Sequence, residues 1–457
     1  MTGSNDDRTS AETAALVEFV FRAASAEIPD AVLHESKRCL LDFLGLAIGA
    51  VAEPAVAIAR RQCELLGGHE QALALGTATR LRATDAAMVN GVAAHAFDFD
   101  DTHVPTILHA TTPLYAASVA LAQWRGRTGL DLLAAHALGY ELGARVSLAL
   151  YPEHYDAGWH MTGTTGPLAA AAASGRMLNL SGPAAVHCLG IAATQACGHR
   201  EQFGTMAKPF HAGHAAAAGA LAALLADDGF TSAPDALQGR RGMFAVMSTV
   251  STPADLVQGL GERWEIFRNG VKPYACGVVT HPAIDALLRL QREADLSVDD
   301  IEHIDLQVHP LVPELTGKME PRTGLEGKFS VVFACAIALL DGAAGERQFS
   351  DANVTRADVR ALIRRIRLTP DAELDHTQAV ATAKRKDGES ISRRVEHASG
   401  TPENRLDDDA LAEKFRDLVG PVLGSTQASE LERRVWEIDS APDLGALLSA
   451  SVPSGPR

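Results

Sequence analysis

The chain has 457 residues, of which 47% are hydrophobic and 21% are charged, a composition typical of a globular protein with two or three domains. Its formal net charge of −16 argues against a surface that binds nucleic acid or an anionic membrane. The six cysteines are widely spaced without a CxxC pair, so we expect buried reduced thiols rather than disulfides or an iron–sulfur cluster. The polar N-terminus does not resemble a signal peptide and no apolar run reaches about 20 residues, so we expect a cytoplasmic protein without a membrane span.

The first part of the chain is rich in alanine, the strongest helix former, and predicts a large helical domain. Ser10 is a candidate N-cap for the first helix, and Pro29-Asp30 begins the second. Further segments with helical character lie at residues 84–97, 113–124, 129–150, 167–178, 183–197 and 211–226. We therefore expect a disordered N-terminus over residues 1–10 and an all-helical domain over residues 11–267.

The pattern changes near residues 262–271, and strand-like alternation occurs further along the chain. Apolar residues at every second position predict a strand at 301–308. Two further strand segments flank Lys386-Asp387-Gly388-Glu389 and predict a β-hairpin. The other expected elements are helices at 282–294, 328–340 and 407–422 and a strand at 365–369. We expect a smaller α+β lid domain over residues 268–400 and a helical segment over residues 401–457 that returns to the helical domain.

Lysine is scarce in this chain, with 8 lysines against 33 arginines. Lys208 is the only lysine between Lys37 and Lys272, and it lies in an uncharged run before an alanine-rich segment. Because arginine fills most other basic positions, each lysine is a candidate for a role that needs an ammonium group. Either an anionic ligand or a structural ion pair would satisfy Lys208.

Histidines are concentrated in the helical part, where ten of the 17 lie between His95 and His214. The densest stretch is His95-Ala-Phe-Asp98-Phe-Asp100-Asp101-Thr102-His103, followed by His109. Burial of unpaired charge is costly, so this stretch is either a solvated helix end with capping aspartates or a functional cluster. The alanine-rich segment before it should be buried, which favours a functional cluster.

Two further stretches place basic groups in unusual surroundings. Gly158-Trp159-His160 precedes a run of threonines and glycines at a helix start, where backbone N–H groups suit an anion. Lys272-Pro273, with His281 beyond, lies at the start of the second domain and is alternatively a rigid linker. Imidazoles, ammonium groups and an aspartate together predict proton transfer on a small anionic substrate. The sequence has no dinucleotide-binding or phosphate-binding glycine motif.

Three other interpretations compete with this hypothesis. Asp98-Phe-Asp100-Asp-Thr102 matches the DxDxT motif of haloacid-dehalogenase-like phosphatases, but that motif follows a β-strand and a helical segment precedes it here. A metal-dependent hydrolase is a better alternative, and its ligands would be His95, Asp98, His103 and His109. A helical scaffold without enzymatic activity would leave the lysine and the histidines unexplained.

Several motifs in order resemble the MmgE/PrpD family, whose members include 2-methylcitrate dehydratase, cis-aconitate decarboxylase and iminodisuccinate epimerase. These motifs are Asn90-Gly91-x-x-Ala-His95-Ala-x-Asp98-Phe-Asp-Asp-Thr102-His103, Gly158-Trp159-His160, Met206-x-Lys208-Pro-x-His211-Ala-Gly213, Lys272-Pro, Pro321-Arg322-Thr323 and Lys328-Phe329-Ser330. The resemblance covers residues 12–420. It implies a large all-helical domain, a smaller α+β lid, a homodimer, an active site in the cleft between the domains, and catalysis without a metal or an organic cofactor.

The resemblance also implies the residues of the site. The expected catalytic residues are His160, His109, Asp98 and Lys208. The expected substrate-binding residues are Thr102, Lys272 and His281, to which the histidine-rich stretch adds His103.

We expect a lyase similar to 2-methylcitrate dehydratase, acting on a small di- or tricarboxylate by acid/base catalysis. An epimerase of an iminodisuccinate-like dicarboxylate is the alternative, because two acid/base groups on opposite faces suit either reaction. A metal-dependent hydrolase ranks below both. In the decarboxylases of this family a functional tyrosine follows the Lys-Phe-Ser segment, and Phe333 takes that position here, which disfavours decarboxylation of cis-aconitate.

Overall fold

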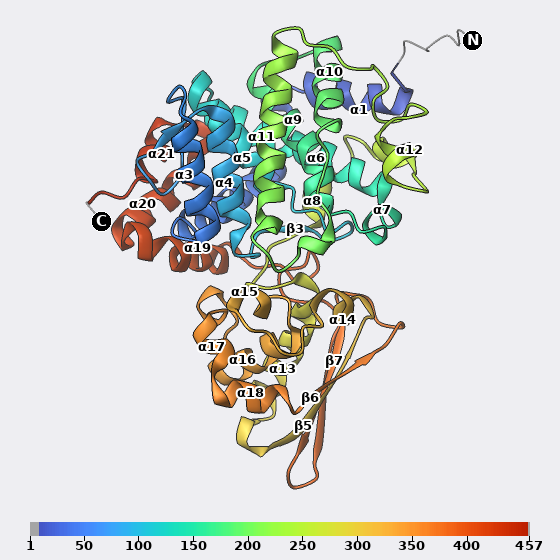
Figure 1. Cartoon of the computed structure of the whole chain (residues 1–457), viewed down its shortest axis with the longest axis vertical. Coiled ribbons are helices and arrows are strands. Elements are labelled where there is room, and N and C mark those ends of the chain that lie inside the picture. The colour runs from blue at the N-terminus through green and yellow to red at the C-terminus, as the bar shows by residue number, and fades with distance from the viewer. Residues whose placement is uncertain (1–8, 456–457) are drawn as a thin grey trace.

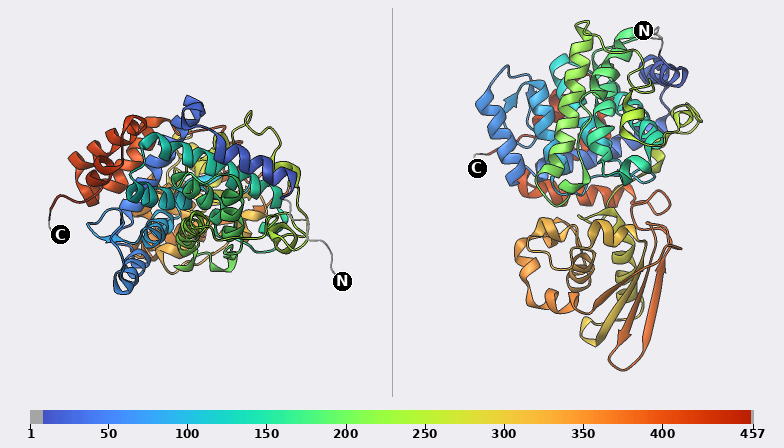
Figure 2. Two further views of the ribbon diagram at one scale, coloured as in Figure 1. Left: turned by 90° about the horizontal axis from the view of Figure 1, so that it is seen from above. Right: turned by 45° about the vertical axis from the view of Figure 1, so that its right-hand side comes forward.

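A computed structural model describes residues 9–455 of the chain, which form two parts (Figure 1). The larger part is a body of packed helices that contains both ends of the described chain, and the smaller part carries a four-stranded sheet. The right-hand view in Figure 2 shows the smaller part projecting from one end of the helical body. The expected fold class, a mainly α protein with a helical domain and a smaller α+β lid domain, is confirmed.

The helical domain is built mainly from the first half of the chain. Its helices are α1 (Ala11–Arg22), α2 (Asp30–Gly49), α3 (Pro54–Leu66), α4 (Ala83–Ala96), α5 (Thr111–Arg125), α6 (Gly129–Leu150), α7 (Glu153–Asp156), α8 (Met161–Thr164), α9 (Gly166–Met177), α10 (Gly182–Ala193), α11 (Ala207–Asp227) and α12 (Met243–Met247). It is not purely helical, because two antiparallel pairs of two-residue strands occur in it. These strands are β1 (Ala72–Leu73) with β2 (Arg80–Leu81), and β3 (Thr102–His103) with β4 (Asn269–Gly270).

Close packing of α4 against α11 brings the two most informative sequence motifs together. A Cβ atom at Gly91 would lie 2.8 Å from the Cα of Gly213, closer than real Cβ contacts occur. A Cβ atom at Gly213 would lie 2.5 Å from the carbonyl oxygen of Met88. Both positions therefore require glycine, and the resulting contact sets the end of α4 beside the start of α11.

Helix α11 begins at Ala207, four residues before the expected start at residue 211. Pro209 lies in its first turn, where the missing backbone N–H of proline has no partner to lose. By length and composition α11 could cross a membrane, but 67% of its most apolar window is buried inside the protein. Its apolar character is therefore explained by its packing against α4, α9 and α10.

The lid domain contains a sheet with the strand order β6–β5–β7–β8. Its strands are β5 (Ile301–Val308), β6 (Ile366–Pro370), β7 (Ala379–Arg385) and β8 (Ser390–Val395). Strand β5 runs parallel to β6 and antiparallel to β7, and β7 and β8 form the expected hairpin. Helices cover one face of the sheet; they are α13 (His281–Glu293), α14 (Leu311–Thr316), α15 (Gly324–Gly327), α16 (Val331–Asp341), α17 (Asp351–Thr355) and α18 (Ala357–Ile363).

The C-terminal segment lies on the helical domain (Figure 1). It forms α19 (Asp408–Leu423), α20 (Ser425–Trp436) and α21 (Gly445–Ala450), and α19 packs along α2. The contact is close at Gly45, where a Cβ atom would meet the ring of Phe415 at 3.2 Å.

The expected N-terminal disorder falls on residues 1–8, outside the described residues, and on Thr9 and Ser10. Both of these are held by hydrogen bonds, from the Thr9 hydroxyl to the carbonyl of Pro234 (3.0 Å) and from the Ser10 hydroxyl to Asp235 (2.9 Å). Ser10 occupies the N-cap position of α1, but its hydroxyl makes this tertiary bond instead of capping the helix. Among the six free cysteines Cys197 is exposed and the others are buried, so the expectation of buried thiols holds for five of them.

Candidate active site

The loop after α4 carries the central carboxylate of the site. Asp98 lies two residues beyond the end of α4 and has a left-handed backbone conformation, with φ of 52°. Few residues other than glycine adopt this conformation, and aspartate is among those that tolerate it best. The side chain is buried, with 3% of the residue exposed.

Two ammonium groups share one oxygen of Asp98. Lys208 Nζ, from the first turn of α11, lies 2.5 Å from Asp98 Oδ1. Lys272 Nζ, from the connection between the domains, lies 3.0 Å from the same oxygen. Burial alone would raise the pKa of Asp98, but the two lysines hold it well below its usual range. The pair of lysines therefore leaves one positive charge without a matching carboxylate at this point.

The backbone carbonyls of residues 97–99 each accept a hydrogen bond from a different lysine. These lysines come from the connection between the domains, from the lid domain and from α19. The contacts are Lys272 Nζ to Asp98 O (2.8 Å), Lys328 Nζ to Phe97 O (2.5 Å) and Lys414 Nζ to Phe99 O (2.8 Å). We call Lys208, Lys272, Lys328 and Lys414 the lysine cluster. Their side chains are at most 7% exposed, so half of the lysines of the chain are buried around one loop.

Four buried imidazoles form a second group, the histidine cluster, which consists of His95, His109, His160 and His211. His95 and His109 meet edge to face with ring centroids 4.8 Å apart, and His95 stacks on His160 at 5.9 Å. The Nδ1 atoms of His160 and His211 are 3.0 Å apart and share a hydrogen bond. All four rings belong to the helical domain.

Two aspartates orient the histidine cluster. His95 Nδ1 donates to Asp100 Oδ2 at 2.8 Å, and His109 Nδ1 donates to the backbone carbonyl of Asp101 at 2.9 Å. Thr102 Oγ1 lies 3.2 Å from the same nitrogen of His109. With Nδ1 engaged, the Nε2 atom of each ring is left free to exchange a proton or bind a ligand.

Burial and the lysines favour the neutral form of His109 and His160. Burial together with Lys272, against the opposing effect of Asp100, lowers the pKa of His109 to about 3. Burial and Lys208 hold the pKa of His160 well below its usual value. Burial also lowers the pKa of the Lys208 ammonium, against the effect of Asp98. At neutral pH the free site therefore contains uncharged His109 and His160 rings beside the lysines.

All four residues expected to be catalytic line one cavity, which we call the histidine cavity: Asp98, His109, His160 and Lys208. The space in it that water can occupy is about 40 Å³, so a small carboxylic acid would require its walls to move apart. The cavity also has apolar and aromatic lining residues, largely from the lid domain: Phe203, Val278, Val279, Leu315 and Phe329. Two of these rings lie beside the Lys208 ammonium, with centroids 5.2 Å (Phe203) and 5.3 Å (Phe329) from Nζ.

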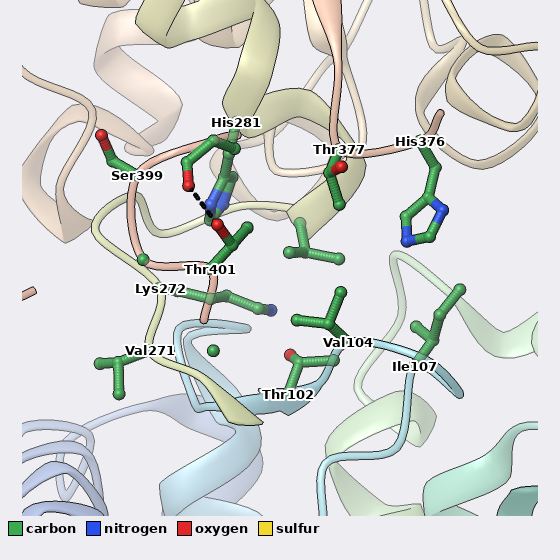
Figure 3. Close-up of a pocket in the computed structure, with 14 residues that line it drawn as sticks. Thr102, Val104, Ile107, Val271, Lys272, His281, His376, Thr377, Ser399 and Thr401 are labelled. Atoms are coloured by element: carbon green, nitrogen blue, oxygen red, sulfur yellow. Dashed lines mark hydrogen bonds between the residues drawn. The ribbon is translucent and has the colours of Figure 1, made fainter. Parts of the chain in front are cut away.

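Three of the four residues expected to bind substrate line a neighbouring cavity, the lid cavity (Figure 3): Thr102, Lys272 and His281. In Figure 3 Thr102 lies on the helical-domain side, and His376 and Thr377 lie opposite it, on the lid side. The lid and histidine cavities share three lining residues, which are Ile107, Lys272 and Val278. Lys272 thus borders both spaces, and Figure 3 shows its extended side chain in the lid cavity.

His103, the fourth expected substrate-binding residue, lines neither cavity. Its ring is fully buried and bonds to Thr106 (2.7 Å) and Glu265 (3.2 Å), under the contact between β3 and β4. Because both ring nitrogens are engaged, His103 supports the fold of the loop and does not face a ligand. His103 was also an expected ligand of the metal-dependent hydrolase, but it belongs to neither group of candidate metal ligands among the described residues.

The other three expected ligands of the hydrolase do lie in groups that could hold a metal ion, together with residues outside the expected set. One ligand atom from each of His95, His109 and His160 lies within 4.8 Å of the others, and Asp98, Asp100 and His109 form a second such group.

Phe333 lies in the core of the lid domain and does not line the histidine cavity. Its ring packs against Phe349 at 5.7 Å and lies beneath Gly327. The absence of a hydroxyl group at this position therefore removes nothing from the cavity wall, and it no longer argues against decarboxylation.

Sequence reasoning did not assign a role to several residues of the site. Lys328 and Lys414 belong to the small set of lysines, so the scarcity of lysine was the signal that could have identified them. His211 lies in the motif that carries Lys208 and was not singled out. The aromatic wall of Phe203 and Phe329 carries no signal of its own in the sequence.

Comparisons with known proteins agree with this architecture. The chain matches the MmgE/PrpD N-terminal domain over residues 14–255 and the MmgE/PrpD C-terminal domain over residues 274–438. A cis-aconitate decarboxylase of Aspergillus terreus is 30% identical over 97% of this chain and 96% of that protein. The cis-aconitate decarboxylase of Homo sapiens is 28% identical over 92% of this chain and 90% of that protein. The expectation of an enzyme of this family is confirmed, with the lyase supported over the isomerase. The chain belongs to the MmgE/PrpD family.

Proposed function

We propose that the chain is a lyase that decarboxylates a small tricarboxylate of the cis-aconitate type by acid/base catalysis. The observation that carries the proposal is the composition of the histidine cavity. It has two ammonium groups on one carboxylate, two imidazoles, and apolar and aromatic side chains among its other lining residues. The names of the relatives support the same reaction. The dehydratase-like reaction expected from the sequence ranks second.

The lysines provide the binding charge for the substrate. Lys208 and Lys272 share Asp98 Oδ1, so together they hold one more positive charge than that carboxylate neutralises. A substrate carboxylate in the cavity would accept hydrogen bonds from both ammonium groups, in a site where little water screens the charge. Lys272 would reach a second carboxylate from the lid cavity, where Thr102 and His281 lie.

The apolar wall suits the group that leaves. A carboxylate held against Phe203, Val278 and Phe329 loses solvation, and it departs as uncharged CO₂. The bond between the carboxyl carbon and the substrate skeleton breaks, its electron pair forms a new double bond to the next carbon, and the π pair of the original double bond moves to that bond's far carbon. His160 as imidazolium then gives one proton to the skeletal carbon that receives the electrons, and His109 is the second candidate for this step.

The proton for that step is taken up from solution when the substrate binds. Burial and Lys208 keep the pKa of His160 low in the free site, so its ring is neutral there. A bound tricarboxylate adds negative charge beside the ring and favours the imidazolium. Substrate binding should therefore take up a proton from solution.

Dehydration and epimerisation rank below decarboxylation because the relatives compared above are named cis-aconitate decarboxylases. Both of these reactions begin by removing a proton next to a carboxylate. Decarboxylation instead needs an imidazolium at its end, a form that the negative charge of a bound substrate favours.

A substrate screen in D₂O tests the proposal. The purified full chain is incubated separately with cis-aconitate, 2-methylcitrate and an iminodisuccinate-type dicarboxylate, and products are followed by NMR together with CO₂ release. We expect CO₂ and one deuterium on the protonated carbon of the product from cis-aconitate. Alkene formation without CO₂ would replace the proposal with a dehydratase, and inversion with deuterium exchange would replace it with an epimerase. Absence of all three reactions would contradict an activity of this class.

We also propose that the chain is a homodimer. The support is a row of exposed apolar side chains along α11 and its start, formed by Met206, Phe210 and Leu221. Light scattering after size-exclusion chromatography should give twice the mass of the chain, and Phe210→Glu should lower it if this row lies in the interface. A monomeric wild type would contradict the proposal.

A further inference from the structure

We propose that His95, His109 and His160 form a binding site for one divalent transition-metal ion, such as Zn²⁺ or Co²⁺, in the substrate-free chain. Their ligand atoms lie within 4.8 Å of one another, and all three rings are buried. Nitrogen ligands at about 2.0–2.1 Å from a tetrahedral ion are about 3.3 Å apart, so binding would draw the rings inward by a small rotation.

Hydrogen bonds already present aim the free nitrogen of two rings. His95 donates from Nδ1 to Asp100, and His109 donates from Nδ1 to the carbonyl of Asp101. In both rings Nε2 therefore carries the lone pair. Metal-binding histidines characteristically donate their other ring nitrogen to a carboxylate or a backbone carbonyl in this way. The Asp100–His95 pair is thus the outer half of a carboxylate–histidine–metal arrangement.

His95 Nε2 is the independent observation that points to a ligand. It is buried and has no hydrogen-bond partner among residues 9–455. An unpaired buried nitrogen of this kind is uncommon, because it loses its bond to water on folding. A metal ion between the three rings would supply the missing partner.

His160 completes the set through its partner His211. Their Nδ1 atoms are 3.0 Å apart, so one ring donates to the other. When His160 is the donor, its own Nε2 is free for the ion, and His211 fixes that tautomer. His109 and His160 line the histidine cavity, which leaves the fourth position of the ion facing open space.

Imidazole ligands select the class of metal. Uncharged nitrogen donors suit Zn²⁺, Co²⁺, Ni²⁺ and Cu²⁺, whereas Mg²⁺ and Ca²⁺ prefer oxygen donors. Asp98 balances part of the charge of Lys208 and Lys272, and Asp100 adds a carboxylate beside His95, which lowers the repulsion that the ion would meet. The consequence, which rests on the proposed function, is inhibition: the ion would occupy the rings that transfer the proton.

Titration of the full chain with Co²⁺ tests the site without any substrate. Tetrahedral coordination by nitrogen should give an intense visible absorption band, and elemental analysis after gel filtration should find one ion per chain. His95→Ala, His109→Ala and His160→Ala should each abolish the band. Asp100→Asn should weaken binding by about 10–100-fold, since it removes only an outer partner. His214→Ala is the matched control on α11 and should bind as the wild type does.

Circular dichroism on each variant shows whether it folds. If an alanine variant does not fold, the measurements on the wild type and on Asp100→Asn still test the site. A wild type that binds no Co²⁺, or a band that survives in all folded histidine variants, would overturn the site. Because no substrate is present, this result is separate from the substrate screen. A chain that binds Co²⁺ but decarboxylates nothing would keep the site and reject only the proposed function.

Discussion

The histidine cluster and the lysine cluster surround the same loop but are assembled in different ways. The histidines all belong to the helical domain, and they contact one another and two aspartates of one short stretch. The lysines come from four separate segments and meet only at residues 97–99. The groups that move a proton are thus placed by one domain, whereas the groups that hold charge depend on both domains and the C-terminal helix.

This difference predicts different consequences of mutation. Removing a histidine should affect the rate more than the assembly of the chain. Removing a lysine should affect binding or the joint between segments, because Lys328 ties the lid domain to the loop and Lys414 ties α19 to it. This difference between the two clusters can be tested by mutation, from the largest expected effect to the smallest.

His160→Ala should lower kcat by about 10²–10⁴-fold, the usual effect of losing a general acid or base. The substrate is the one identified by the screen in D₂O, and folding is checked by circular dichroism. His214→Ala, a half-buried histidine on α11, should keep its activity. A folded His160→Ala protein with near-normal turnover would show that proton transfer is not the role of the histidine cluster.

Lys414→Met should lower the free energy of unfolding by about 3–5 kcal/mol, measured by urea denaturation. Lys414 Nζ lies 2.6 Å from Asp42 Oδ1, and both side chains are buried, so the variant leaves a carboxylate without its partner. Adding Asp42→Asn to Lys414→Met should recover part of the loss, because it removes the unpaired charge.

Arg433→Met is the control for the C-terminal segment, since the ion pairs of Arg433 with Glu430 and Glu437 are exposed. Its stability should stay close to that of the wild type. Equal losses in the Lys414 and Arg433 variants would mean that the lysine cluster does not hold the segments together.

Lys208→Met should raise KM by about 10–100-fold, because a hydrogen bond to a charged group is worth about 1.5–3 kcal/mol. Steady-state kinetics separates this from an effect on kcat. Lys384→Met, on the surface of the lid sheet, is the matched control and should leave KM unchanged. If Lys208→Met lowers kcat and leaves KM alone, Lys208 belongs with the proton-transfer groups.

The sequence predicted local structure well, but it predicted the separate roles of the histidine cluster and the lysine cluster only in part. Residues 129–150 and 301–308 were predicted to the residue, because the first has a clear start and a long apolar pattern and the second alternates strictly. His103 lies in the same histidine- and aspartate-rich stretch as His109. Its ring bonds to Glu265, however, and lines neither cavity. Lys414 lies 315 residues from its partner Phe99, and nothing local indicates a contact of that range.

The smallest expected effect is on the pH dependence of stability. Burial lowers the pKa of His109 to about 3, below the value of about 6.5 in the unfolded chain. Between these values the unfolded chain binds a proton that the folded chain does not, so stability falls as the pH decreases from about 6.5 toward 3. Asp101 acts in the opposite sense, because burial and Asp42 raise its pKa to about 7. Its contribution therefore falls as the pH rises from about 4 to 7.

Urea denaturation between pH 4 and 6 measures these two slopes. His109→Asn should make the free energy of unfolding less dependent on pH, by at most about 1.4 kcal/mol per pH unit, since one fewer proton is taken up on unfolding. Asp101→Asn should change the slope in the opposite direction. An unchanged slope in His109→Asn would mean that this ring is already protonated in the folded chain. The histidine cluster would then hold positive charge at rest, and its separation in role from the lysine cluster would fail.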